Sequence, residues 1–318
     1  MTGNADRPRV AISACLMGEE VRYNGGHKRH RWVTDVLGEF VDLRPLCPEF
    51  EIGMGVPREP IRLVNHDGAV HAETQDGEND YTAPLAALAD DYRTEAARWD
   101  GIILMQGSPS CGLFRVKLYN ERGFPTDSTA GIFAGRLRKQ TPLLPMEEAG
   151  RLNDSHLREN FLTRVFMQQR WRQADPGQSA AALVDFHSRS KYLIMAHSYP
   201  TYQALGKLLS DLSNKDIRKV ASDYQHQVAE ALARPASRGQ VANALQHLQG
   251  YVRDRVSSDH RQSLRAVIDK YQDGLVPMIV PLTLLQHHID TAWEEDSYVR
   301  RQFFLTPYPE ALGLRNQI

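Results

Sequence analysis

The chain has few cysteines and no long apolar run. Its 318 residues include only three cysteines, Cys15, Cys47 and Cys111. No run of about 18 apolar residues occurs, so we expect no membrane-spanning helix and no membrane partner. Residues 1–8 lack the apolar core of a signal peptide, so we expect a cytoplasmic protein. In a reducing compartment three cysteines do not form a disulfide framework, and they serve packing, a metal site or catalysis.

Several binding motifs are also missing from the sequence. It contains no G-x-G-x-x-G, no P-loop and no G-x-S-x-G nucleophile elbow. Nothing in it therefore indicates nicotinamide, flavin or nucleoside triphosphate. It also lacks C-x-x-C pairs, the usual sign of a structural zinc site.

The composition is that of a globular protein with an uneven charge. Hydrophobic residues make up 42% and charged residues 24%, and the length suffices for two domains. The net charge is −1, yet residues 1–150 carry 17 Lys and Arg against 22 Asp and Glu, and the remainder carries 21 against 17. A mildly basic second half is compatible with a polyanionic partner without requiring one.

The first half alternates extended apolar runs with helical patterns. We expect strands over residues 9–15, 40–46, 101–105 and 141–145, helices over residues 30–37, 82–99 and 130–139, and a hairpin or irregular excursion over residues 61–80. This order is typical of an α/β fold with a doubly wound parallel sheet. We assign residues 1–150 to this domain.

Strand patterns disappear after Gly150. Apolar residues recur at helical spacing over residues 155–173, 178–196, 200–212, 214–234, 237–254, 257–273 and 280–300. Prolines separate some of these segments. The pattern predicts an all-α domain of about seven helices over residues 151–318.

Each cysteine lies where an extended apolar run stops and a turn begins. Cys15 and Cys47 directly follow such runs, and Cys111 closes the turn Gly107–Gly112. Because ligands bind at the carboxyl ends of parallel strands, three thiols at three such ends are able to converge. Taken singly, each cysteine is more typical of a small buried hydrophobe. Taken together, they indicate a shared site.

Three thiolates without a fourth suit an open metal site. A [4Fe–4S] cluster is normally bound by four cysteines, so three leave one iron free for water or substrate. Such an iron acts as a Lewis acid or binds a soft atom such as sulfur. A zinc site is an alternative that the spacing leaves open.

Four short blocks surround these cysteines. They are Ser13–Gly18 (SACLMG), Arg22–Gly25 (RYNG), Leu46–Glu49 (LCPE) and Ser108–Gly112 (SPSCG). In this order they resemble the motifs of the bacterial thiouracil and 4-thiouridine desulfidase family, and the resemblance covers most of residues 8–148. Asn24 stands where this family commonly has an acidic residue.

The second half resembles the helical YbgA-like domain that is often fused to this family. The matching blocks are Leu152–Asp154, Phe186–His187, Lys191–Ser198, Pro281–Leu285 and Leu314–Asn316. The fused form is similar to desulfidases that convert 4-thiouridine in tRNA to uridine. The resemblance therefore implies tRNA as a partner and an RNA-binding role for the helical domain.

The resemblance also implies a cofactor and a reaction. A [4Fe–4S] cluster would be held by Cys15, Cys47 and Cys111, and its free iron would take the thiocarbonyl sulfur of a thiolated pyrimidine. Water would attack the ring carbon and leave a carbonyl without net redox change. The enzyme would act as a hydrolase or a lyase.

Such a reaction needs a proton carrier and a hydrogen-bond donor. Glu49 follows Cys47 by two residues, and we expect it to act as general acid and base. Its alternative role is a capping or surface carboxylate. Ser108 and Ser110 are expected to bond substrate or sulfur, with Ser108 preferred, although Ser-Pro-Ser is also good turn sequence.

Basic and aromatic residues are candidates for contacts to substrate or RNA. In the first domain these are Asn24, His27, Lys28, Arg29, Arg31, Arg115 and Lys117, and in the second Arg189, Lys191 and Tyr192. The non-functional alternatives are a solvated charged face and amphipathic helix packing. The functional alternatives contact phosphates or stack on bases.

The sequence thus favours an iron–sulfur desulfidase acting on 4-thiouridine in tRNA. One alternative keeps the chemistry but takes free thiouracil or thionucleosides as substrate. A second is a non-catalytic iron–sulfur sensor whose helical domain binds RNA or a protein. The sequence does not indicate the oligomeric state.

Overall fold

The computed structural model describes residues 7–318. The chain divides into two compact units, the first ending at Asn153 and the second covering Asp154–Ile318. The change of sequence pattern predicts this boundary near Gly150–Asn153. No helix among the described residues is long and apolar enough to cross a membrane.

A four-stranded parallel sheet lies at the centre of the first unit. Its strands are β1 (Arg9–Ser13), β2 (Asp42–Leu46), β5 (Gly101–Leu104) and β8 (Met146–Glu148), in the order β2-β1-β5-β8. Ser13 pairs with Leu46 and Ile12 pairs with Ile103, so the first three strands end nearly level. Their carboxyl ends meet at one edge, where ligands bind in such sheets. The predicted parallel α/β sheet is confirmed.

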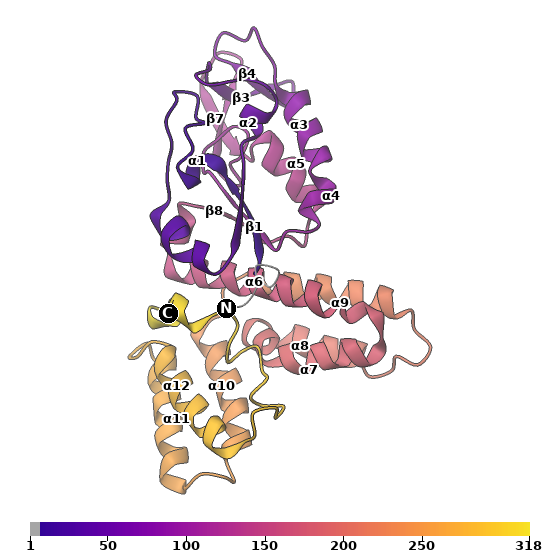
Figure 1. The fold of residues 1–318 in the computed structure, drawn as a ribbon, viewed down its shortest axis with the longest axis vertical. Helices are drawn as coiled ribbons and strands as arrows, with labels where there is room; N and C mark the ends of the chain where they lie inside the picture. The colour runs from indigo at the N-terminus through magenta and orange to yellow at the C-terminus, as the bar shows by residue number, and fades with distance from the viewer. Residues whose placement is uncertain (1–6) are drawn as a thin grey trace. The chain divides into compact units, whose positions relative to one another are not determined.

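Within residues 7–153, five α-helices accompany this sheet. They are α1 (Ala14–Met17), α2 (Pro48–Glu51), α3 (Thr82–Asp91), α4 (Arg93–Ala96) and α5 (Ile132–Gln140). The helices α3, α4 and α5 cover one side of the sheet, and α1 lies on the other (Figure 1). Phe133 and Leu137 of α5 are fully buried against Ile102 and Leu104 of β5. This packing holds α5 against β5.

Two predicted elements of the first unit differ in the structure. The segment predicted as a helix over residues 30–37 forms a π-helical turn, Trp32–Val36, and then a 3-10 turn, Leu37–Glu39. Its β-branched residues and Gly38 disfavour a regular α-helix. The last strand, predicted over residues 141–145, begins only at Met146, because Pro142 and Pro145 cannot donate to a strand ladder.

A second, mixed sheet accompanies the first. Its strands are β3 (Ile61–His66), β4 (Ala69–Thr74), β6 (Val116–Asn120) and β7 (Pro125–Thr129), in the order β4-β3-β6-β7. The hairpin of β3 and β4 corresponds to the predicted excursion over residues 61–80. The other two strands were not predicted, because β7 is polar and exposed along most of its length and shows no apolar alternation.

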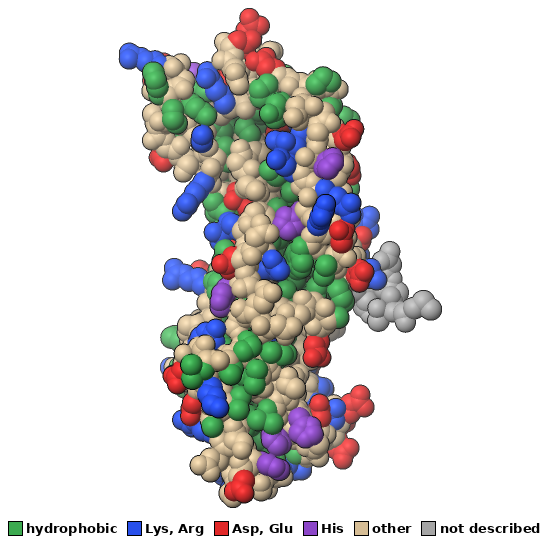
Figure 2. Space-filling view, turned by 90° about the vertical axis from the view of Figure 1, so that its left-hand side faces the viewer, with side chains coloured by type: hydrophobic (Ala, Val, Ile, Leu, Met, Phe, Trp, Pro, Cys, Tyr) green, Lys and Arg blue, Asp and Glu red, His purple; other side chains and the backbone are tan. Residues whose placement is uncertain are grey.

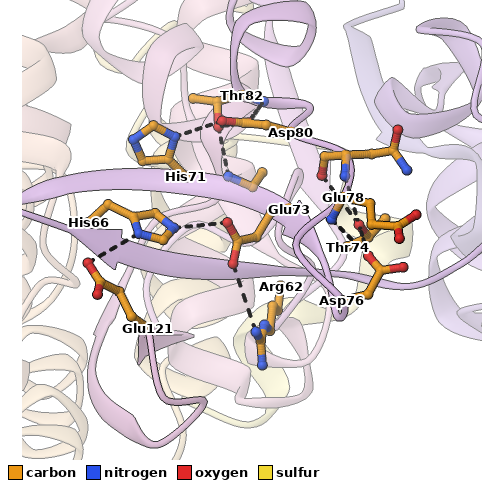
Figure 3. A network of polar contacts seen from close by, with 12 residues as sticks. Arg62, His66, His71, Glu73, Thr74, Asp76, Glu78, Asp80, Thr82 and Glu121 are labelled. Atoms are coloured by element: carbon orange, nitrogen blue, oxygen red, sulfur yellow. Dashed lines mark hydrogen bonds and ion pairs between the residues drawn. The ribbon is translucent and has the colours of Figure 1, made fainter.

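Polar contacts join the exposed face of this hairpin (Figure 3). His66 lies 2.9 Å from Glu73 and 3.4 Å from Glu121, and His71 lies 2.7 Å from Asp80. Hydrogen bonding to Glu73 raises the pKa of His66 above its usual value. These contacts link the two strands and the turn that follows them.

The second unit is all-helical, as predicted. Its seven α-helices are α6 (Ser155–Ala174), α7 (Ala180–His197), α8 (Tyr199–Leu208), α9 (Ile217–Leu232), α10 (Arg238–Val252), α11 (Ser258–Gln272) and α12 (Ile279–Ala292). The helices α10, α11 and α12 form a small bundle (Figure 1). An aromatic group of Trp171, Phe186 and Tyr224 lies in the core beside α7.

Capping side chains explain where these helices begin. Six of the seven have a Ser or Asp that accepts a hydrogen bond from a backbone N–H of the first turn. These residues are Asp154, Ser179, Ser198, Asp216, Ser237 and Ser257. Each bond satisfies an N–H that the helix itself leaves unpaired. The helix starts therefore lie within three residues of the predicted ones.

Candidate active site

The three cysteines of the chain line one cavity of about 190 Å³. Cys15 lies in α1 directly after β1, and Cys47 lies between β2 and α2. Cys111 lies in the turn that follows β5. Residues that are far apart in the sequence are thus brought together at the carboxyl edge of the parallel sheet.

Burial dominates the acid–base behaviour of these thiols. It raises the pKa of Cys15 to about 11, with a further increase from Cys47. Burial also raises the pKa of Cys47 and of Cys111, and the charge of Cys47 contributes to the second increase. All three thiols line the same cavity, and a cation bound there would lower their pKa values and favour the thiolate form.

The start of α5 holds the turn that carries Cys111. The backbone N–H of Gly131 donates to the carbonyl of Gly112 at 2.8 Å, and that of Ala134 donates to the carbonyl of Ser110 at 3.0 Å. A Cβ on Gly131 would lie 2.6 Å from the Ser110 oxygen and 2.7 Å from the Pro109 oxygen. Only glycine allows this approach, so the turn is closely packed against the helix.

Glu49 is bonded to the serines of the same turn. Ser110 Oγ donates to Glu49 Oε1 at 2.7 Å and also lies 3.6 Å from Cys111 Sγ. Ser108 Oγ lies 3.0 Å from Ser110 Oγ and 3.4 Å from Glu49 Oε1. A hydroxyl has one proton to donate, so the shorter bond to Glu49 defines the orientation of Ser110.

Arg58 holds the other oxygen of Glu49. Its Nε and Nη2 donate to Glu49 Oε2 at 3.0 and 2.7 Å. Its Nη1 donates at 2.9 Å to the carbonyls of Val21 and Gly55. The sequence did not indicate Arg58, because it lies in an aperiodic segment rich in glycine and proline. Its role is visible only once Glu49 is placed beside it.

Two other carboxylates fix the backbone around the cysteines. Glu51 Oε1 accepts the N–H of Cys47 at 2.9 Å, and Glu51 Oε2 accepts the hydroxyl of Tyr92 at 2.7 Å. The buried Glu148 of β8 accepts the N–H of Leu113 at 2.8 Å. These residues were also missed, since their partners are backbone groups that no side-chain pattern reveals.

The loop between α1 and the π-helical turn forms part of the cavity wall. Arg22 and Tyr23 line the cavity, and Tyr23 is 41% exposed. Asn24 does not line it, and its Oδ1 accepts the N–H of Gly26 at 3.2 Å within the loop. Lys28 N–H donates to the carbonyl of Cys15 at 2.8 Å, which fastens the basic part of the loop beside that thiol.

Four basic side chains of this loop are exposed. They are His27, Lys28, Arg29 and Arg31. Arg29 pairs with Asp35 at 2.5 Å, so part of its charge is already compensated. Arg115 and Lys117 are also exposed and do not line the cavity. On the face that Figure 2 shows, Lys and Arg lie scattered among other side chains rather than in one continuous patch.

The candidates in the helical unit have internal partners. Arg189 pairs with Asp185 at 2.5 Å, and Lys191 Nζ lies 5.0 Å from the ring centroids of Tyr192 and Tyr298. Tyr192 is only 5% exposed, and its hydroxyl lies 2.9 Å from that of Tyr251. The Tyr192 ring is part of the core, as the alternative of amphipathic helix packing expects.

The donor set of the cavity fits an iron–sulfur cluster. Among the described residues no three His, Cys, Asp or Glu side chains lie close enough together to bind one metal ion. A [4Fe–4S] cluster takes each cysteine on a different iron, so its ligands stand farther apart than those of a single ion. Three thiols around one cavity, those of Cys15 and Cys111 buried and that of Cys47 partly exposed, suit this arrangement better than mononuclear zinc.

Comparison with known proteins places both parts of the chain. Residues 10–149 match the family described as 2-thiouracil desulfurase, and residues 191–309 match a family described as a protein of unknown function, DUF1722. The chain is 31% identical over 167 residues to the uncharacterised protein YbgA of Escherichia coli (strain K12), covering 52% of this chain and 98% of YbgA.

Two further similarities concern the desulfidase part. The uncharacterised protein YbbK of Bacillus subtilis (strain 168) is 30% identical over 115 residues, which cover 32% of this chain and 72% of YbbK. A solved structure, that of the [4Fe-4S]-dependent thiouracil desulfidase TudS, is similar with 29% identity and a TM-score of 0.38, covering 46% of this chain and 94% of that one. The chain therefore belongs to the same family as YbgA, and its residues 10–149 match the 2-thiouracil desulfurase family ahead of the DUF1722 region.

Proposed function

We propose that the chain is a [4Fe–4S]-dependent desulfidase that converts 4-thiouridine in tRNA to uridine. The observation that carries this proposal is the joint placement of Cys15, Cys47, Cys111 and Glu49 in one cavity. The three cysteines would hold the cluster. When bound, the cluster would supply a thiophilic Lewis acid that polarises the carbon–sulfur bond.

Glu49 is the proton carrier of this site. The reaction exchanges one water for one sulfide at the ring carbon, so the carbon–sulfur bond is replaced by a carbon–oxygen bond and no electron acceptor is needed. Glu49 Oε1 takes a proton from the water and returns it to the ring or to the departing sulfur. Arg58 occupies Oε2, which leaves Oε1 as the atom that exchanges protons.

Ser110 and Tyr23 act on the position of the reactants. Ser110 donates to Glu49 Oε1 and orients the carboxylate toward the thiols. Tyr23 lines the cavity and remains 41% exposed, so its ring offers an apolar face to a pyrimidine. Arg22, on the same wall, adds a positive charge near Cys15.

The tRNA part of the proposal rests on the basic loop. The exposed His27, Lys28 and Arg31 belong to the segment whose backbone is bonded to Cys15. The charges of Lys28 and Arg31 at this position are suited to contact the phosphates that flank a thiolated nucleotide. The positive balance of the second half of the chain supports the same substrate.

One observation favours a second substrate. The family that matches residues 10–149 is described by the free base 2-thiouracil. A free base needs no phosphate contacts, so the same cavity chemistry would serve it without the basic loop. The two substrates therefore differ in their dependence on Lys28 and Arg31.

A substrate comparison tests the proposal. Anaerobically prepared protein is incubated with thiolated tRNA, with 4-thiouridine and with 2-thiouracil, and the loss of thiocarbonyl absorbance is followed. A K28Q/R31Q variant should lose at least about tenfold in kcat/KM on tRNA at low salt and little on the free compounds. Turnover of free 2-thiouracil with none of tRNA would reject the tRNA substrate, and no turnover of any compound would reject the desulfidase.

A further inference from the structure

A second cavity, of about 170 Å³, lies inside the helical unit. Residues of α6, α7, α10 and α11 and of the C-terminal segment form its walls. Its polar lining includes Glu159, His197, Arg238, Tyr271 and Arg315. The proposed desulfidase chemistry uses none of these residues.

Arg315 is the most buried cation of this lining, with 6% of its surface exposed. Its Nη1 donates to the carbonyl of Leu305 at 2.9 Å, and its Nη2 donates to the carbonyl of Phe304 at 2.6 Å. Its buried Nε has no hydrogen-bond partner. No carboxylate side chain among the described residues pairs with this guanidinium, and a buried cation without a counter-charge is costly.

Arg238 brings a second guanidinium to the same cavity. Its Nη1 donates to the carbonyls of Tyr271 and Val276 at 3.1 and 3.4 Å, and it lies 5.0 Å from the Tyr271 ring centroid. The charges of Arg238 and Arg315 both oppose the rise in the Tyr271 pKa that burial causes. Both guanidinium groups therefore lie near the Tyr271 hydroxyl, and both line the same cavity.

The remaining polar groups leave room for an anion. Glu159 is the one carboxylate side chain of the lining, and its Oε1 is occupied by the hydroxyls of Tyr308 at 2.9 Å and Thr163 at 3.1 Å. His197 also lines the cavity, and its buried Nδ1 has no partner. Burial lowers the pKa of His197 to about 4, so the ring is neutral at neutral pH and contributes a hydrogen-bonding group rather than a charge.

We propose that this cavity binds a small oxyanion, a free phosphate or the carboxylate of a small metabolite, between Arg238 and Arg315. Guanidinium groups bind such oxyanions through paired, charge-assisted hydrogen bonds. The free Nε of Arg315 supplies one donor, and the neutral His197 supplies another. The lining holds two guanidinium groups and one carboxylate side chain, that of Glu159, so one bound anion would balance the side-chain charges of the cavity.

The test is calorimetric titration of the full-length protein. Inorganic phosphate and acetate are titrated separately at constant ionic strength, with chloride as the reference anion. The proposal predicts saturable binding with one site per chain for phosphate, acetate or both, and the better ligand identifies the source. A saturating ligand also raises the Tm of the helical unit, by about 3–6 °C at ten times Kd.

Two variants separate this site from general ion binding. Arg238→Gln removes one guanidinium and should weaken Kd by about tenfold or more, because charge-assisted bonds are lost. Arg253→Gln removes a 71% exposed arginine at the far end of α10 and should leave Kd unchanged. Arg238 is used because loss of the buried Arg315 endangers folding.

Two results would overturn the proposal. One is the absence of saturable binding by either anion, which would mean that groups of the chain already neutralise the cavity. The other is equal binding by the Arg238→Gln and Arg253→Gln variants. Neither result touches the desulfidase proposal, which concerns the other cavity.

Discussion

Arg58 and Glu49 form a buried ion pair in which both hydrogen bonds from the guanidinium to the carboxylate end on one oxygen, Oε2. The Arg58 side chain is 5% exposed and that of Glu49 is 14% exposed. Oε2 of Glu49 accepts hydrogen bonds from Nε and Nη2 of Arg58 at 3.0 and 2.7 Å, and Oε1 accepts one from the Ser110 hydroxyl at 2.7 Å. The carboxylate is thus divided into an oxygen that is held and an oxygen that faces the serine and the thiols.

Arg58→Lys tests the positioning role of this pair. Lysine keeps the charge but cannot donate a fork of two bonds to one carboxylate. We expect kcat to fall by about 10- to 100-fold with little change in KM, because the carboxylate is misplaced while the substrate still binds. Steady-state kinetics measures this, with iron quantitation on the same sample.

The matched control is Arg62→Lys. Arg62 lies in β3 of the same unit and pairs with Glu73 at 3.8 Å, away from the cavity. It should retain wild-type kcat. Equal kinetics of the two variants would show that the fork to Glu49 has no part in turnover.

Glu49→Gln tests the proton carrier. The amide preserves the size of the side chain but cannot accept a proton, so we expect kcat to fall by about 10²- to 10⁴-fold while iron and sulfide content are retained. Glu59→Gln, an exposed carboxylate ten residues further on, is the control and should keep full activity. A Glu49→Gln enzyme with full turnover would remove Glu49 from the mechanism.

We expect alanine substitutions of the two serines to affect different measurements, stability for Ser108 and turnover for Ser110. Ser108 Oγ accepts the N–H groups of Ser110 and Cys111 at 3.3 and 3.1 Å, so Ser108→Ala should lower Tm and cluster retention. Ser110→Ala removes the 2.7 Å bond to Glu49 and should lower kcat by about tenfold with the cluster intact. The sequence favoured Ser108 as the acting serine, and the distances favour Ser110. The opposite pattern of effects would restore Ser108.

The helical unit should lose stability in acid. Burial lowers the pKa of His187 and of His197 to about 4, below the ordinary value of 6.5. Because the unfolded chain binds these protons first, the stabilisation is complete above pH 6.5 and is lost as the pH falls toward 4. The loss is on the order of 3 kcal/mol per histidine. Chemical unfolding followed by helix content at several pH values measures it.

His187→Gln serves as the variant for that measurement. His187 Nδ1 lies 3.2 Å from the Tyr224 hydroxyl, a contact that glutamine is able to replace. The variant should show a shallower decrease of stability between pH 6.5 and 4 than the wild-type protein. Parallel curves would show that His187 is protonated as readily in the folded chain as in the unfolded one.

The meeting of the three cysteines could be predicted from the sequence. Cys15 and Cys47 follow runs that read clearly as strands, and parallel topology places their ends together. The position of Glu49 followed from its closeness to Cys47. The seven helices of the second half were also predictable, because apolar periodicity and polar caps agree there.

Other parts of the site could not be predicted. Arg58 is defined by a tertiary contact with Glu49, and its segment has no periodicity. The strand β8 reads Met-Glu-Glu, and its acidic residues are buried only because Glu148 accepts backbone N–H groups and Glu147 pairs with Arg151. The burial of Tyr192 could not be predicted either, because sequence pattern does not distinguish an exposed aromatic residue from a buried one on the same helix.

The most direct test of the central claim is iron and sulfide quantitation on anaerobically purified protein, followed at once by incubation with thiolated tRNA. We predict about four irons per chain, a falling thiouridine absorbance, and loss of both in Cys15→Ala, Cys47→Ala and Cys111→Ala. Protein that contains no iron in any anaerobic preparation, or that desulfurates equally well without these cysteines, would contradict the account.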